Sequence, residues 1–164
     1  MEAIHWGEAR DLRTFWRKES WRSSSNFNGL FSHAAAKYLV QKESIDKYLV
    51  HYKKELEDRL QMIHSGFQQL KSKGYSVDSI APQAAIYLTI QLDLAGRSNG
   101  ENILEQQKDV TDYILNEAKL AVVPFYAFGA SKNSNWYRLS VGTCKKEEIP
   151  VMISTLENAL AKLR

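Results

Sequence analysis

The spacing of apolar residues changes along this chain, and the change constrains its fold more than any other feature. Between residues 45 and 70, apolar side chains recur at steps of three and four, which indicates one face of an α-helix of about seven turns. Between residues 86 and 94 they alternate with polar ones, which is typical of a strand with one buried face. The helical stripe consists of Ile45, Leu49, Tyr52, Leu56, Leu60, Ile63, Phe67 and Leu70.

Weaker signals extend this pattern to the rest of the chain. Asn102 and Glu105 are spaced as a capping box, and Thr143 is suited to cap a last helix. The expected elements are, in order, helices at 30–42 and 45–73, a strand at 86–94, a helix at 103–118, strands at 120–123 and 136–141, and a helix after Thr143. This order predicts an α+β fold: a small mixed or antiparallel sheet with helices packed on one face, preceded by a long connecting helix.

The N-terminal segment differs from the rest. Three tryptophans alternate with basic residues in the segment 6–22, for which a short helix is expected. The polar run 23–29 indicates a loop and a boundary. We therefore divide the chain into an N-terminal segment or linker at 1–29, a helical connector at 30–74 and an α+β domain at 75–164.

Composition excludes several classes of protein. The 164 residues are 44% hydrophobic and 25% charged, as in globular domains, and a net charge of +3 does not indicate a nucleic-acid binder. No apolar run approaches the roughly 20 residues of a membrane helix. The single cysteine, Cys144, cannot form an intramolecular disulfide, and no signal peptide is evident. We expect a cytoplasmic protein that binds neither nucleic acid nor membrane.

One strand residue is a candidate for ligand binding. In the segment Trp136–Val141, Tyr137 and Leu139 share one face, and Arg138 lies on the other. A guanidinium held on a rigid strand can bind a carboxylate through two parallel hydrogen bonds. The alternative is a solvated or salt-bridged arginine on the open face of the sheet.

Several segments resemble a known family. The segment Leu120–Gly129 (LAVVPFYAFG), followed by Trp136–Ser140 (WYRLS), resembles the C-terminal part of the class I/II pyridoxal-phosphate-dependent aminotransferases of fold type I. Pro82–Leu88 (PQAAIYL) resembles the start of a strand in their small domain, and the long helix resembles the connector between their two domains. The resemblance implies that residues 1–29 are a remnant of the large domain or a linker and that residues 75–164 are the small domain.

The resemblance also implies a function. The family exchanges an amino group between an amino acid and a 2-oxo acid by means of pyridoxal phosphate, and Arg138 occupies the position of the arginine that binds the substrate carboxylate. Such enzymes form homodimers, so a homodimer is expected.

The cofactor site of the family, however, is not recognisable in this sequence. The family's cofactor lysine follows a serine in the large domain, and neither Ser131-Lys132 nor Ser72-Lys73 stands in a matching place. No glycine-rich phosphate cradle is found either. We therefore expect no catalytic, cofactor-binding or metal-binding residue in this chain, no covalent attachment of pyridoxal phosphate to it, and no activity of this part alone.

A second function stays open. The same fold could serve as a stand-alone, non-catalytic interaction domain, because the apolar stripe and the N-terminal tryptophans would otherwise be exposed. Other candidate residues are weaker. The four histidines are dispersed, and Cys144 would have a lowered pKa only if it lies near the N-terminus of the last helix.

Overall fold

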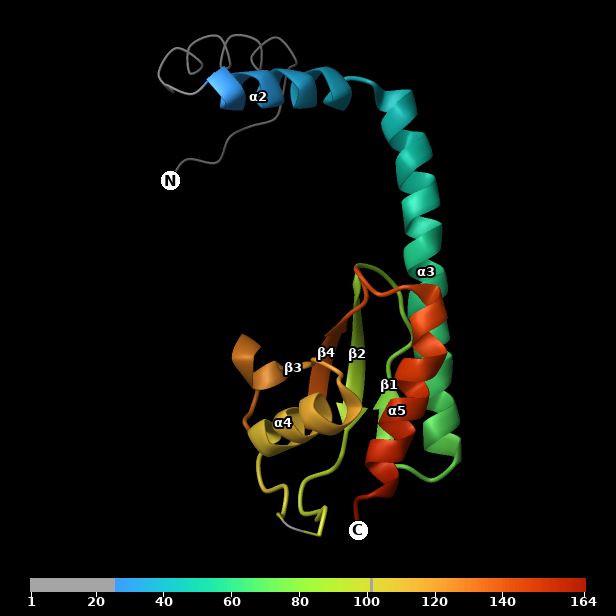
Figure 1. Ribbon diagram of the computed structural model, residues 1–164, viewed down its shortest axis with the longest axis vertical. Coiled ribbons are helices and arrows are strands. Elements are labelled where there is room, and N and C mark those ends of the chain that lie inside the picture. The colour runs from blue at the N-terminus through green and yellow to red at the C-terminus, as the bar shows by residue number, and fades with distance from the viewer. Residues whose placement is uncertain (1–25, 101) are drawn as a thin grey trace. The chain divides into compact units, whose positions relative to one another are not determined.

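The computed structural model describes residues 26–100 and 102–164 (Figure 1). The chain forms two units, of which the first ends at Val50 and the second comprises His51–Arg164. The helix expected at 6–22 lies outside the described residues.

Two helices begin the described chain. They are α2 (Asn26–Leu39) and α3 (Lys42–Ser72). The expectation of a loop up to Gly29 was wrong for residues 26–29, which form the first turn of α2, because a run of polar residue types does not by itself prevent a helical backbone. Gly74 follows α3 with φ of 94°, a left-handed conformation that suits glycine. Among the described helices, none has both the length and the apolar character to cross a bilayer.

The sheet has four antiparallel strands in the order β1-β2-β4-β3. The strands are β1 (Val77–Ser79), β2 (Tyr87–Leu92), β3 (Val123–Pro124) and β4 (Trp136–Ser140). Strand β1 was not expected, because three residues are too few to show an alternation. Strand β3 is shorter than the expected 120–123, since Leu120 and Val122 are buried without pairing to β4.

The remaining helices start later than their expected caps. Helix α4 (Gln107–Ala118) begins after Gln106, whose N–H donates to the Asp109 carboxylate at 2.8 Å, whereas the N–H of Asn102 donates to Asn99 in a turn. Helix α5 (Ile149–Ala161) follows the 3₁₀ helix η2 (Lys146–Glu148), so Thr143 is not its cap. Pro150 lies in the first turn of α5, where its missing N–H costs no hydrogen bond.

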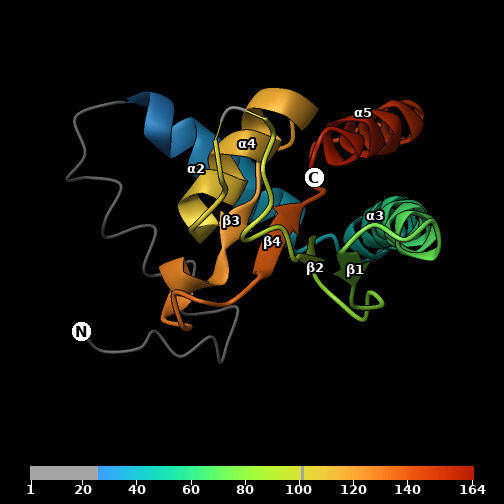
Figure 2. The same cartoon turned by 90° about the horizontal axis from the view of Figure 1, so that it is seen from below.

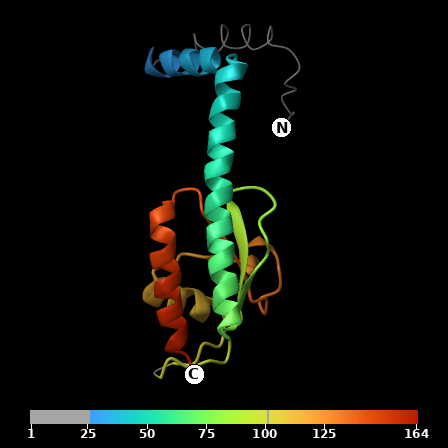
Figure 3. The ribbon, with the colours of Figure 1, turned by 90° about the vertical axis from the view of Figure 1, so that its right-hand side faces the viewer.

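The helices cover one face of the sheet, as expected. Figure 2 shows α4 and α5 on the same side of the strands, and Figure 3 shows α5 beside α3. The core between these layers holds Leu60, Ile63, Phe67 and Leu70 of α3, Leu88, Ile90 and Leu92 of β2, Ile114 of α4 and Leu156 of α5. The predicted α+β fold with an antiparallel sheet is therefore confirmed.

Candidate carboxylate-binding site

Arg138 lies in the middle of β4, with Thr89 of β2 on one flank and Val123 of β3 on the other. Its neighbours Tyr137 and Leu139 are buried in the core, with exposed fractions of 1% and 4%. Because side chains alternate along a strand, Arg138 extends from the opposite face of the sheet, where it is half-buried. The predicted orientation of this residue is confirmed.

Two aromatic rings hold the guanidinium group of Arg138. Its Cζ atom lies 4.2 Å from the ring centroid of Tyr87 and 4.2 Å from that of Phe128. Tyr87 begins β2, and Phe128 ends η1 (Phe125–Phe128), the 3₁₀ helix that follows β3. Since β2 and β3 flank β4 on opposite sides, the two rings reach Arg138 from opposite sides. Both contacts have the geometry of a cation–π interaction.

No aspartate or glutamate of the described residues forms an ion pair with Arg138. Several of these acids have other partners. Glu55 and Asp58 bind Lys146, and Asp78 binds Lys71. The hydrogen bonds from these lysines hold the pKa values of all three carboxyl groups below their usual range. In the described part of the chain, Arg138 is therefore a cation without an anion.

Phe125, the first residue of η1, contacts the ring of Phe128. The two rings meet edge-on, with the centroids 6.3 Å apart. Gly129 ends η1 with φ of 89°, and the N–H of Ala130 donates to the Phe125 carbonyl. Phe125 therefore supports the ring that lies over Arg138.

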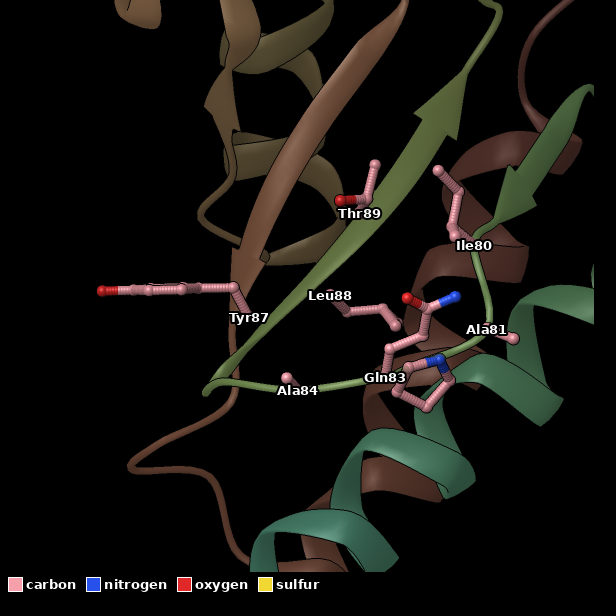
Figure 4. Close-up of a pocket in the computed structure, with 8 residues that line it drawn as sticks. Ile80, Ala81, Gln83, Ala84, Tyr87, Leu88 and Thr89 are labelled. Atoms are coloured by element: carbon pink, nitrogen blue, oxygen red, sulfur yellow. The ribbon is translucent and has the colours of Figure 1, made fainter.

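A hollow of about 300 Å³ lies beside Tyr87 (Figure 4). It is lined by the link between β1 and β2, Ile80–Ala84, and by the first residues of β2. The ring of Tyr87 extends away from Ile80 and Gln83, so it does not fill the hollow. At the end of this link Ala85 has φ of 68°, a left-handed conformation that ordinarily favours glycine.

A second hollow, of about 380 Å³, is less suited to a ligand. Three of its four carboxylates already have partners, since Asp109 accepts the N–H of Gln106, Asp112 binds Lys108, and Glu117 binds Lys162 at 2.6 Å. Residues 26–100 and 102–164 contain no group of three or more side chains placed to hold a metal ion.

The lysines within 26–100 and 102–164 do not have the environment that covalent binding of pyridoxal phosphate requires. A lysine that forms a Schiff base needs a desolvated environment to become nucleophilic. Lys132 is exposed, and Lys73 donates to both carboxylate oxygens of Glu157 at 2.6 and 2.8 Å. Every other lysine of the described residues is exposed or half-exposed as well.

Cys144 does not have the activated character considered for it. It lies before η2 and not at the start of α5, and burial raises the pKa of its thiol. A lowered pKa, as in nucleophilic cysteines, is excluded by this environment.

Comparison with known proteins identifies the family. The family model for aminotransferases of class I and II matches residues 18–156 of the chain. The chain belongs to this family. A relative described as a probable aspartate/prephenate aminotransferase of Rickettsia bellii is 32% identical to this chain over 84 residues, which are 50% of this chain and 20% of the relative. The chain thus spans about a fifth of that relative's length.

Solved structures agree with the family. The aspartate aminotransferase from Rhizobium meliloti superimposes with a TM-score of 0.61 over 71% of this chain and 28% of that protein, at 22% identity. The aromatic aminotransferase from Pyrococcus horikoshii superimposes with a TM-score of 0.59 over 79% of this chain and 30% of that protein, at 26% identity. Complete enzymes of this family use pyridoxal phosphate.

Tyr87 and Phe128 are site residues that the sequence alone did not identify. Both belong to segments that carried the family resemblance, but nothing local to either segment indicates a contact with Arg138. For Tyr87, part of the information was present once the pairing of β2 with β4 is known. The alternation of side chains along β2 then places Tyr87 on the same face of the sheet as Arg138.

Proposed function

We propose that this chain is the C-terminal part of an aminotransferase and that Arg138 binds the substrate carboxylate. The reaction is the exchange of an amino group between an amino acid and a 2-oxo acid. One observation carries the proposal: a guanidinium group on a rigid strand, without an acidic partner among the described residues, in a chain of this family. Two parallel hydrogen bonds between the guanidinium and a carboxylate are strong and geometrically specific.

We also assign each segment of the polypeptide to a part of such an enzyme. Residues 75–164 are the small domain, residues 30–74 the connector, and residues 1–29 a remnant of the large domain or a linker. The lysine that attaches pyridoxal phosphate lies outside this chain, in a complete cytoplasmic homodimer. The exposure of the described lysines supports this assignment.

The test replaces Arg138 in a protein that carries this chain together with the rest of the enzyme. Arg138→Gln should raise KM for amino acid and 2-oxo acid substrates by about 100-fold or more, because a desolvated charge-assisted pair contributes about 3 kcal/mol. Arg138→Lys keeps the charge but loses the two-pronged geometry, so an intermediate effect is expected. Arg97→Gln is the control, because Arg97 donates to Ser76, which directly precedes β1, and has no contact with Arg138 among the described interactions. An unchanged KM in Arg138→Gln would contradict the assignment.

A second candidate function is a non-catalytic interaction domain of the same fold. It is favoured by exposed apolar side chains in the first unit, such as Phe31 and Val40, with exposed fractions of 76% and 71%. Such a surface is typical of an interface. A defined oligomer of the purified chain, with no effect of Arg138 on any activity, would favour this alternative.

A further inference from the structure

The contacts of Arg138 limit how its guanidinium group can be approached. A guanidinium is planar, and its N–H donors point outward within the plane. The Cζ atom of Arg138 lies 4.2 Å from the ring centroids of both Tyr87 and Phe128, which belong to segments on opposite flanks of β4. A ligand cannot enter between the guanidinium and either ring at this distance, so it must approach the N–H donors from a side that neither ring occupies.

The same contacts restrict the motion of a long side chain. A free arginine loses about 0.5–1.5 kcal/mol of rotamer entropy when a ligand immobilises it. Here the rings come from backbone segments that are themselves held, since Tyr87 pairs with Ser140 in the sheet and η1 is closed by the hydrogen bond from Ala130 to Phe125. The side chain of Arg138 is therefore ordered before any ligand arrives.

We infer that Tyr87 and Phe128 are positioning residues, which hold the guanidinium of Arg138 so that its donor edge faces an incoming carboxylate. The inference rests on the proposed function for the identity of the ligand, but the ordering of Arg138 can be measured without it. The contact is with the ring of Tyr87, so the role depends on the ring and not on the hydroxyl group.

The first measurement concerns the order of Arg138 in the free chain. Ring currents should shift the Nε–Hε and Hδ resonances of Arg138 upfield of those of other arginines in NMR spectra of the 164-residue protein. Tyr87→Leu and Phe128→Leu should each reduce this shift, whereas Tyr87→Phe should keep it. Tyr126→Leu is the matched control, because Tyr126 lies on the same helix η1 without contacting Arg138. Unchanged Arg138 resonances in both leucine variants would overturn the inference.

The second measurement uses acetate as the carboxylate probe, followed by the Arg138 resonance. Tyr87→Leu and Phe128→Leu should raise Kd for acetate about threefold to tenfold, the fold-change that corresponds to ordering one long side chain on binding. Tyr87→Phe and Tyr126→Leu should bind acetate as the unmodified chain does. Amide spectra of all variants show whether the fold is intact, so a loss of binding through unfolding is recognised.

The outcomes separate this inference from the proposed function. If acetate binds at Arg138 with equal affinity in the unmodified chain and in both leucine variants, the positioning role is overturned and the proposed function stands. If acetate does not shift the Arg138 resonance of the unmodified chain, the proposed function is contradicted, and the ring-current comparison decides the positioning role by itself.

Discussion

The turn beside Tyr87 depends on the backbone conformation of one residue, Ala85. Its φ of 68° lies in the left-handed region, which costs an alanine about 1–2 kcal/mol. Glycine adopts this conformation freely, although it loses more entropy on folding.

Ala85→Gly should therefore raise the free energy of unfolding, by up to about 1 kcal/mol. Ala84→Gly is the matched control, since Ala84 is also exposed but does not have a positive φ, and it should lower the free energy by about 0.5 kcal/mol. Urea unfolding of both variants measures the difference. A stability of Ala85→Gly at or below that of Ala84→Gly would show that the turn is not left-handed.

The neighbouring residue Tyr137 explains why the alternation of side chains along β4 predicted the face of the sheet on which Arg138 lies. Burial raises the pKa of Tyr137 to about 12, as expected for a side chain that lies in the core. Its neighbour cannot point the same way, so the prediction for Arg138 needed only the local sequence. Predicting that Tyr87 and Phe128 contact Arg138 required the pairing of β4 with both β2 and β3.

Among the contacts between elements, the packing of α3 against α5 depends on a glycine at their closest approach. A Cβ atom placed on Gly66 of α3 would lie 2.7 Å from Cδ1 and Cγ1 of Ile153 on α5. The absence of a side chain at Gly66 lets the two helices pack beside each other, as Figure 3 shows.

Gly66→Ala should lower the free energy of unfolding by about 1–3 kcal/mol, because the added methyl group forces Ile153 to move. Ile153→Ala removes the obstructing atoms, so the double variant should be more stable than the sum of the two single effects predicts. Chemical unfolding of the four proteins gives this coupling energy. Additive effects would mean that the two residues are not in contact.

A second link between elements depends on pH. Lys146 of η2 donates to Glu55 and Asp58 of α3 at 3.0 and 2.6 Å, and these bonds lower the pKa values of both carboxyl groups. Carboxyl groups with lowered folded-state pKa values stabilise the fold above their unfolded-state pKa values, and this contribution is lost as the pH falls.

Lys146→Met should therefore lose less stability than the unmodified chain between neutral pH and about pH 3, a range that includes the ordinary pKa values of Glu and Asp. Lys145→Met is the control, because Lys145 is exposed and contacts neither Glu55 nor Asp58. Thermal unfolding at several pH values measures the slope. Equal slopes in Lys146→Met and the unmodified chain would rule out this ion pair as a source of acid sensitivity.

The start of a helix was the element-scale feature least predictable from sequence. Asn102 with Glu105, and Thr143, each have the residue types of a cap, but the helices begin at Gln107 and Ile149. Several polar residues near a helix compete to cap it, and the packing of its apolar face against the sheet decides which one succeeds. The short strand β1 was not predicted for a related reason. Its three residues show no periodic pattern of their own, and only their pairing with β2 identifies them as a strand.

At the scale of the whole molecule, the exposed apolar residues of the first unit predict self-association. Leu39 and Val40 have exposed fractions of 69% and 71%. Covering such a surface is favourable by about 25 cal/mol for each Å² of apolar area. The family resemblance also implies a homodimer, so both arguments point to the same measurement.

Gel filtration with light scattering should show a molar mass that rises with concentration above the 18.8 kDa of one chain. Val40→Lys should shift the protein toward the monomer, whereas Val151→Lys should not, although Val151 is 66% exposed on α5. A monomer at all concentrations would contradict the prediction. An equal effect of both substitutions would show that the association is non-specific.

The long helix α3, the strands β2 and β4, the α+β class and the face on which Arg138 lies could all be predicted from the amino-acid sequence. These features follow from the periodicity of side chains along one segment, and no other part of the chain is needed to see it. The strand order and the position of Arg138 between Tyr87 and Phe128 became visible in the folded chain alone. The reason is that a contact between residues far apart in the chain depends on which strands pair and in which register, and a local pattern does not specify either.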